Sequence, residues 1–296
     1  MYKEHKIAVV MPAYNEELLI EEAVNNVPDY VDRLYVINDC SRDRTLEILN
    51  DMASRDSRIV VIDHKVNKGL GQSLIDGYVA SRDSSDIDVT AVMAGDNQMH
   101  PGDLPGLLDA IIEDGYDYSK GNRLLHTDIS KMPTYRFLGN SALTILTKFA
   151  TGYYNIMDPQ SGYTAIRNKA LENIPIEKMT RGYGYNADIL NMLNIRRYKV
   201  TDVEIRPVYD REQSKIKLWK YIPKTSWILT SLFFRRLWQR YIVMDFHPLI
   251  LFYLFAFFNF FVISVPMGIR FVYYYAKYDE LPKTTLTILT FTLLMT

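Results

Sequence analysis

Short apolar runs alternate with helix-periodic segments along the first part of the chain. The apolar runs are 7–11, 33–37, 59–63 and 88–93, and the segments with helical spacing that follow them are 16–27, 43–54, 70–82 and 103–114. Strands that alternate with helices in this way indicate β-α-β units. The pattern therefore predicts an α/β fold, with a mainly parallel sheet flanked by helices.

The end of the chain follows a different pattern. Phe246–Ile269 runs for 24 residues without Asp, Glu, Lys or Arg, longer than the roughly 20 residues that cross a bilayer. A core helix rarely stays apolar on every face, so we predict a transmembrane helix near 248–268. A second apolar run from Thr284 reaches Thr296 after 13 residues. That is too short to span, so we expect a second span that is truncated here.

The formal net charge of −1 conceals a segregation of charge. Residues 1–212 hold 24 basic and 32 acidic side chains, 213–240 hold seven basic and no acidic ones, and 241–296 hold three of each. A basic excess before an apolar span favours a cytoplasmic N-terminal domain. We therefore predict a cytoplasmic catalytic domain over 1–212, basic amphipathic juxtamembrane helices over 213–245 and a transmembrane region over 246–296. The second zone suits an anionic bilayer surface, although a solvated basic helix is the alternative.

Other classes of protein find little support in the sequence. Cys40 is the only cysteine, so no intrachain disulfide can form. The five histidines lack metal-ligand spacing, and there is no phosphate-binding loop or nucleophile elbow, so hydrolase and ATPase functions are not indicated. We expect no nucleic-acid partner.

Polar residues follow each of the four predicted strands. These segments are Met11–Glu17, Asn38–Asp43, His64–Gly71 and Ala94–Pro101. Any one of them could serve only to cap the next helix. Ligands of such sheets, however, bind at the carboxyl ends of the strands, and four successive strands bring carboxylates, an amide and a Gly-rich turn to that edge. A divalent metal carrying a diphosphate would satisfy converging carboxylates.

These motifs, in their order, resemble the family 2 glycosyltransferases of GT-A fold, and among them the polyprenyl-phosphate sugar transferases such as dolichyl-phosphate mannose synthases. The resemblance covers about residues 7–217. Four segments are similar to the family's P-x-Y-N-E, D-D-x-S-x-D, Gly-rich and D-x-D-x-Q elements: Pro12–Glu16, Asn38–Asp43, Asn67–Gly71 and Ala94–Gln98. Three later ones resemble G-x-R, S-G-F and S-K: Gly121–Arg123, Ser161–Tyr163 and Ser214–Lys215.

The resemblance implies roles for individual residues. It implies that a nucleotide diphosphate sugar is held by Pro12, Tyr14, Glu16, Ile37, Asp39, Lys68, Ala94, Asp96, Arg211 and Lys215. It implies that Asp96 and Gln98 ligate Mg²⁺ or Mn²⁺, and that the acceptor phosphate meets Arg123, Lys131 and Arg136.

Two departures from the family pattern change these expectations. Ala94 replaces the first carboxylate of the metal motif, which leaves Asp96 as the one direct carboxylate ligand; Mg²⁺ commonly manages with one or two carboxylates plus phosphates. Arg211 stands closer to Lys215 than in the family pattern, and the glycine is missing. Arg206 is an equal candidate for this role, and the third alternative is that neither arginine fills it.

The implied activity is transfer of a sugar, with inversion, from a UDP- or GDP-sugar to dolichyl or undecaprenyl phosphate at the membrane. Asp96 and Arg123 would then be catalytic. A phosphate oxygen is already anionic and needs no strong base, whereas a hydroxyl acceptor needs a carboxylate, for which Asp158 and Asp188 are the candidates.

Two alternatives stay open. One is a transferase acting on a glycan or glycolipid hydroxyl, although no Q-x-x-R-W element is present. The other is a non-catalytic membrane scaffold on a degenerate GT-A domain, which Ala94 suggests. The resemblance also allows a homo-oligomer assembled through membrane helices.

Overall fold

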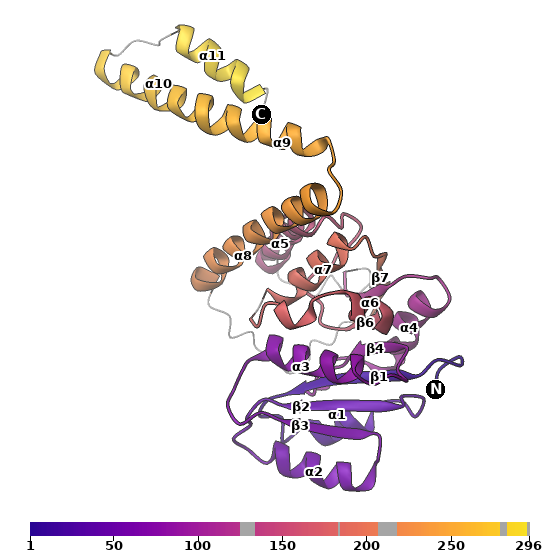
Figure 1. Cartoon of the computed structure of the whole chain (residues 1–296). Helices are drawn as coiled ribbons and strands as arrows, with labels where there is room; N and C mark the ends of the chain where they lie inside the picture. Colours follow the sequence, from indigo (N-terminus) through magenta and orange to yellow (C-terminus); the bar gives the residue numbers. More distant parts are fainter. Residues whose placement is uncertain (125–133, 183, 207–217, 279–282, 295–296) are drawn as a thin grey trace. The chain divides into compact units, whose positions relative to one another are not determined.

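A computed structural model describes residues 1–124, 134–182, 184–206, 218–278 and 283–294. The chain divides into two compact units, Met1–Arg236 and Leu237–Thr296. The first unit is built on a seven-stranded sheet of order β3-β2-β1-β4-β6-β5-β7 (Figure 1). Its strands are β1 (Ile7–Ala13), β2 (Arg33–Asn38), β3 (Ile59–Asp63), β4 (Val89–Val92), β5 (Tyr118–Asn122), β6 (Thr164–Arg167) and β7 (Val200–Glu204).

The four predicted strands are β1 to β4, and they pair in parallel. β5 and β7 are also parallel to each other. The sheet is nevertheless mixed, because β6 runs antiparallel to both of its neighbours, β4 and β5. This reversal was not predicted. It brings Thr164, at the start of β6, beside Val92 at the end of β4 and beside Lys120 in β5.

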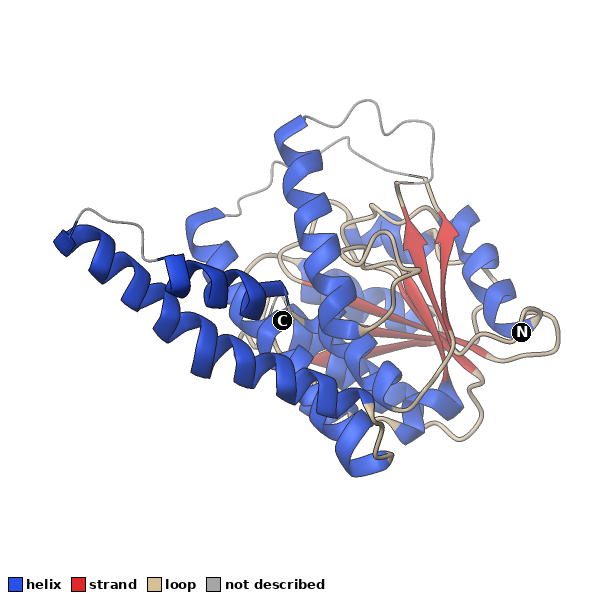
Figure 2. Cartoon of the chain, turned by 90° about the horizontal axis from the view of Figure 1, so that it is seen from above, coloured by secondary structure: helices blue, strands red, loops and turns tan. Residues whose placement is uncertain are grey.

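Helices cover both faces of the sheet (Figures 1 and 2), and the period-2 alternation of the strands decides which face each side chain serves. Ile7, Val9 and Met11 pack in one core with α1 (Ile20–Asn25), α2 (Thr45–Arg55) and α4 (Leu104–Ile112). Ala8 and Val10 pack in the opposite core with α3 (Leu70–Arg82), α6 (Asn168–Asn173) and α7 (Tyr185–Ile195). The four predicted helical segments correspond to α1 to α4.

Two longer helices complete the first unit. These are α5 (Thr134–Thr151) and α8 (Leu218–Trp238), of which residues up to Arg236 belong to this unit, together with the short 3-10 turns η1 (Pro101–Asp103) and η3 (Ile176–Lys178). Leu229 and Leu232 of α8 pack with Ala150 of α5 and Ala187 of α7 in a small third core. Trp227 on the same helix is 76% exposed, so α8 buries one stripe and presents an aromatic side chain on another.

The described residues of the second unit are mostly helical, with a short non-helical link at 245–248. It contains η4 (Gln239–Met244), α9 (Leu249–Phe258), η5 (Asn259–Ser264), α10 (Val265–Tyr278) and α11 (Lys283–Leu294). The stretch Leu249–Tyr278 is a 30-residue helical segment, long and apolar enough to cross a membrane by length and composition. α11 is shorter, so the described residues contain one candidate span. Asn259 Nδ2 donates to the Thr292 carbonyl at 2.7 Å, and Ser264 and Thr292 hydroxyls lie 3.0 Å apart.

Candidate functional site

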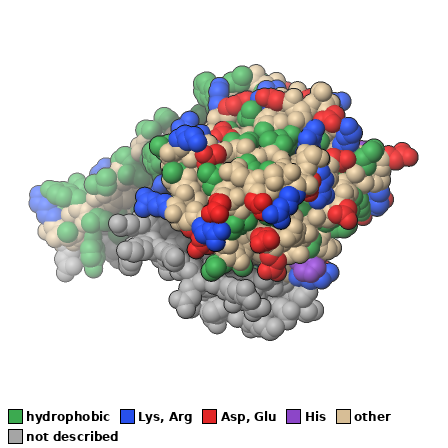
Figure 3. All heavy atoms as spheres, turned by 90° about the horizontal axis from the view of Figure 1, so that it is seen from below, with side chains coloured by type: hydrophobic (Ala, Val, Ile, Leu, Met, Phe, Trp, Pro, Cys, Tyr) green, Lys and Arg blue, Asp and Glu red, His purple; other side chains and the backbone are tan. Residues whose placement is uncertain are grey.

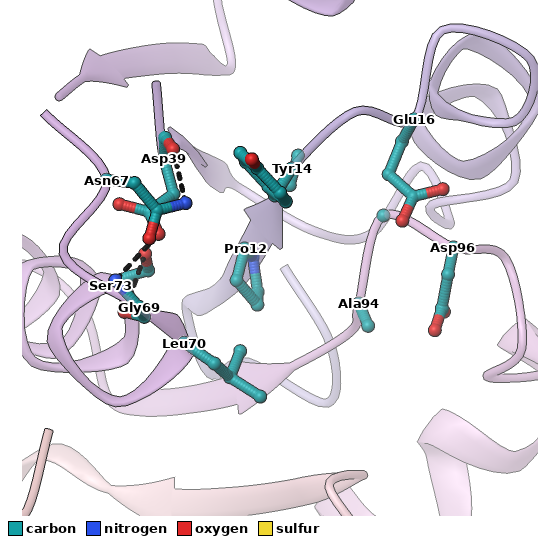
Figure 4. Close-up of a pocket in the computed structure, with 12 residues that line it drawn as sticks. Pro12, Tyr14, Glu16, Asp39, Asn67, Gly69, Leu70, Ser73, Ala94 and Asp96 are labelled. Carbon is teal, nitrogen blue, oxygen red and sulfur yellow. Dashed lines mark hydrogen bonds between the residues drawn. The ribbon is translucent and has the colours of Figure 1, made fainter. Parts of the chain in front are cut away.

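A pocket of about 360 Å³ opens at the carboxyl ends of β1, β2 and β4, beside the start of α3. It is lined by Pro12, Ala13, Tyr14, Glu16, Asp39, Asn67, Gly69, Leu70, Ser73, Ala94, Gly95 and Asp96. Asp39 and Asn67 lie on one side, Glu16 and Asp96 lie on the other, and Pro12 and Tyr14 stand between them (Figure 4). The structure therefore places six of the predicted nucleotide-sugar residues in the lining of one pocket, namely Pro12, Tyr14, Glu16, Asp39, Ala94 and Asp96.

The loops that form this edge adopt conformations unusual for residues other than glycine. Asn15, Cys40 and Asn97 have φ values of 56°, 60° and 56° and follow β1, β2 and β4 respectively. Such backbones persist where surrounding contacts hold them. The Asn15 amide donates to Ser41 Oγ at 3.0 Å, and Asn15 Oδ1 accepts from the Arg42 amide at 2.8 Å. The first two loops therefore hold each other in place.

The Asp39 carboxylate is engaged on both oxygens by protein donors. Oδ1 accepts from the Lys68 amide and Oδ2 from the Gly69 amide, each at 2.8 Å, and Oδ1 lies 2.8 Å from His64 Nδ1. Asp39 is buried, so these partners compensate its loss of hydration. Its first role is to fix the turn before α3, where Gly69 has a φ of 86°.

His64 and Asp76 extend this network away from the pocket. His64 Nε2 lies 2.8 Å from Asp76 Oδ2, so both ring nitrogens face carboxylate oxygens. Burial opposes ionisation of Asp76, but hydrogen bonds from Gln72, His64 and Lys68 outweigh it and lower its pKa. No role was predicted for His64 or Asp76. The histidine carried a signal, because it directly follows β3, whereas Asp76 lies in the second turn of α3.

The predicted metal ligands lie on the loop after β4. Asp96 Oδ1 accepts from the Gln98 amide at 3.1 Å, and the Glu16 carboxylate lies on the same side of the pocket as Asp96 (Figure 4). Among the described residues, no group of three or more His, Cys, Asp or Glu could hold a metal by itself. The oxygen donors suit Mg²⁺ or Mn²⁺. One or two carboxylates would supply part of the coordination shell of such a metal, and phosphate oxygens would supply the rest.

Arg123 and Asp158 form the second polar cluster. Arg123 Nε and Nη2 donate to Asp158 Oδ2 and Oδ1 at 2.7 and 3.1 Å, a two-pronged pair. The Asp158 side chain is 6% exposed and that of Arg123 is 40% exposed. Burial raises the pKa of Asp158, but Arg123, with help from the charge of Lys120, outweighs burial and lowers it. Asp158 therefore stays ionised and orients the Arg123 side chain at the end of β5.

Asp188, the other candidate base, is buried in α7 with its oxygens engaged. Oδ2 accepts from the amide and hydroxyl of Thr180 at 2.8 and 2.6 Å, and Oδ1 accepts from Arg235 of α8. Its side chain is 2% exposed. Asp188 thus ties α8 and the segment before α7 together, and it is not among the residues that line the pocket.

The remaining predicted residues lie in several places. Ile37 is fully buried in the core against α3, so its side chain does not line the pocket. The Lys68 ammonium lies 3.3 Å from Asp76. Arg206 pairs with Asp103 at 3.3 Å. Lys131, Arg211 and Lys215 lie outside the described residues, and Arg136 lies in α5 where side chains are not described.

Comparison with known proteins decides the family. Residues 8–175 match the model of glycosyl transferase family 2. The chain belongs to this family. It is a glycosyltransferase, and the resemblance drawn from its motifs is confirmed.

Its relatives include enzymes named for lipid phosphates. The chain is 26% identical over 217 residues to the UDP-N-acetylglucosamine–dolichyl-phosphate N-acetylglucosaminyltransferase of Methanococcus voltae, covering 69% of this chain and 86% of that one. It is 30% identical to the dolichol-phosphate mannosyltransferase of Pyrococcus furiosus over 58% of this chain and 49% of that one. The undecaprenyl-phosphate mannosyltransferase of Micrococcus luteus is 25% identical over 62% and 76%.

Solved structures share the fold of this glycosyltransferase. Glucosyl-3-phosphoglycerate synthase from Mycobacterium tuberculosis, in complex with Mn²⁺, UDP and glucosyl-3-phosphoglycerate, aligns with a TM-score of 0.58 and 20% identity. The alignment covers 79% of this chain and 80% of that one. The likeness supports a GT-A-like α/β fold.

Proposed function

We propose that this glycosyltransferase is a membrane-bound, inverting enzyme that moves a sugar from a UDP- or GDP-sugar to a polyprenyl phosphate such as dolichyl or undecaprenyl phosphate. The relatives named above, two of them dolichyl-phosphate and one an undecaprenyl-phosphate transferase, support this acceptor class. The candidate span Leu249–Tyr278 and the exposed Trp227 support a site near a bilayer, where aromatic side chains favour the interface.

The observation that carries the choice of acceptor is the pairing of Asp158 with Arg123. A hydroxyl acceptor needs a general base whose pKa is near the working pH. Asp158 has a lowered pKa and gives both oxygens to Arg123, and Asp188 gives its oxygens to Thr180 and Arg235. Neither is placed to take a proton. A phosphate acceptor is already anionic and needs a cation, which Arg123 provides.

On the donor side, Tyr14 would pack against the base, and Glu16 would accept hydrogen bonds from the base or ribose. Asp96 and Gln98 would hold Mg²⁺ or Mn²⁺. The metal, when bound, would offset the charge that grows on the leaving diphosphate. Arg123, oriented by Asp158, would hold the acceptor oxygen in line with the anomeric carbon.

The face of the first unit seen in Figure 3 carries acidic and basic side chains interspersed, as a solvated surface does. This agrees with a catalytic domain exposed to the aqueous side of the membrane. We assign that side to the cytoplasm from the basic excess of residues 213–240. Assembly into a homo-oligomer through membrane helices stays a prediction.

The test is transfer of label to lipid. Purified full chain in detergent would be incubated with Mg²⁺ or Mn²⁺, radiolabelled UDP- and GDP-sugars and either dolichyl or undecaprenyl phosphate, and label would be counted in the organic phase. We expect product with one donor, reduced at least about 100-fold in Asp96→Asn and unchanged in the control Asp114→Asn, an exposed aspartate two residues after α4. Transfer to a glycan hydroxyl alone would contradict the proposal.

A further inference from the structure

Lys120 is a fully buried lysine in the middle of β5 that belongs to none of the motifs above. A buried ammonium costs several kcal/mol unless protein groups replace its hydration. Its Nζ donates to the Ser161 carbonyl and to Asn186 Oδ1, the latter at 3.0 Å. Lys120 therefore joins β5 to the turn before β6 and to the first residues of α7.

Both contacts hold the same turn, Asp158–Ser161. The turn is closed by the Ser161 amide, which donates to the Asp158 carbonyl at 3.3 Å. Asn186 also reaches the turn, because its Nδ2 donates to the Gln160 carbonyl at 3.3 Å. Lys120 thus holds the turn directly through Ser161 and indirectly through Asn186.

This turn and the two residues after it contact two parts of the candidate site, namely Arg123 and the loop that carries Asp96. It begins with Asp158, which holds Arg123. A Cβ added to Gly162 would lie 3.2 Å from Met99 Cε, and the Tyr163 hydroxyl donates to the His100 carbonyl at 3.2 Å. Met99 and His100 continue the loop that carries Asp96. A shift of the turn would therefore move Arg123 relative to the donor pocket.

The charges that face Lys120 come from three elements. Burial lowers the pKa of Lys120 to about 8, Asp158 and Asp202 act in the opposite direction, and Arg123 adds to the lowering. Burial raises the pKa of Asp202, which lies in register with Lys120 on β7. Asp202 Oδ2 accepts from Asn122 Nδ2 at 2.8 Å and from the Met157 amide at 2.6 Å.

We propose that Lys120 is a positioning residue for acceptor binding, which holds the Asp158–Ser161 turn and through it the orientation of Arg123. This inference rests on the proposed function, because it assigns Arg123 to the acceptor phosphate. Lys120 itself acts through the turn and touches no substrate.

The test compares Lys120→Met, Lys120→Arg and Asn186→Leu with the control Lys169→Met, an exposed lysine in α6. Lys120→Met keeps the length of the side chain but loses the charge and both hydrogen bonds. Asn186→Leu removes the link from Lys120 through Asn186 to the Gln160 carbonyl and keeps the direct bond to Ser161. It replaces Lys120→Met in the test if that variant does not fold. Each full-length variant would be assayed for the KM of polyprenyl phosphate and of the nucleotide sugar, and for amide hydrogen exchange over 158–163.

We expect Lys120→Met to raise the acceptor KM at least about tenfold, to leave the donor KM within about twofold and to speed exchange over 158–163. Lys120→Arg should recover part of the acceptor affinity. Acceptor kcat/KM of the wild type should fall above about pH 8, where Lys120 loses its proton, and this limb should be absent in Lys120→Arg.

An equal rise in both KM values, or an unchanged acceptor KM in folded Lys120→Met and Asn186→Leu, would overturn the inference. If the wild type transfers no sugar to any polyprenyl phosphate, the proposed function fails instead. Hydrogen exchange then decides the inference alone, since unchanged protection over 158–163 refutes positioning of the turn and faster exchange supports it.

Discussion

The Nδ1 atom of His64 lies 2.8 Å from the Asp39 carboxylate, behind the wall of the candidate nucleotide pocket. Asp76 lies at the same distance from the other ring nitrogen. Each ring nitrogen of the imidazole thus contacts a carboxylate from a different element. The imidazole therefore links the loop after β2 to α3, and the position of Asp39 depends on it.

His64→Phe keeps the ring but removes both contacts. We expect a loss of about 1–3 kcal/mol in the free energy of unfolding, because Asp39 is left buried with fewer donors. We also expect a rise of about tenfold in the KM of the nucleotide sugar with little change in that of the acceptor. Urea unfolding and steady-state kinetics measure these, with His5→Phe as the control. A rise confined to the acceptor KM would show that the network serves another site.

Asp188 and Arg235 allow a test between a structural and a catalytic carboxylate. Arg235→Gln should lower the free energy of unfolding by about 1–3 kcal/mol, because it leaves the Asp188 charge buried with one partner fewer. Asp188→Asn should cost a similar amount. A double-mutant cycle by urea unfolding should give a coupling of about 1–3 kcal/mol.

The same variants decide the catalytic question. We expect kcat of folded Asp188→Asn to stay within about threefold of the wild type. Loss of a general base would instead reduce it by roughly 10²–10⁴. A reduction of that size in a protein that remains folded contradicts the structural role.

Ala94→Asp restores the carboxylate that the family motif has at this position. A second carboxylate adds charge and a ligand to the proposed metal site. We expect Mn²⁺ to bind about tenfold more tightly in the presence of UDP or GDP, measured by electron paramagnetic resonance of free Mn²⁺. Ala94→Asn is the matched control without charge. Equal affinities in the two variants would place the metal away from this loop.

The pH dependence of stability should report on Lys120. Its pKa is about 8 in the folded protein, against an ordinary lysine pKa of 10.5. Between these values the unfolded chain binds more protons, so stability rises with pH. Measured against Lys120→Met, which lacks this group, the wild type should gain roughly 3 kcal/mol between pH 8 and 10.5. Urea unfolding at fixed pH values measures the difference, and parallel curves would contradict it.

The first four strand and helix pairs were predictable because their apolar residues repeat with a regular period. β5 was not predicted, since Tyr118–Asn122 contains Ser119, Lys120 and Asn122. These polar residues are tolerated inside the sheet because each finds a partner: Ser119 donates to the Leu107 carbonyl and Asn122 to Asp202. Such partners are 12 to 80 residues away, so no local pattern reveals them.

The candidate site shows the same limit. That Asp39 and Asp96 meet at one pocket follows from the order of strands in a parallel sheet. That Asp188 is committed to Arg235, 47 residues further on, does not, because only the docking of α8 brings them together. The candidate carboxylates could thus be predicted from the sequence. Only the structure separates those that line the pocket from those, such as Asp188, that link helices.

The reversed direction of β6 has a consequence for how such enzymes diversify. The predicted nucleotide-binding loops follow strands β1 to β4, whereas the Asp158–Ser161 turn precedes β6. Changes in this turn act on the segment that leads into β6 and leave the ends of β1 to β4 as they are. Within one domain, specificity for the two substrates can therefore evolve separately.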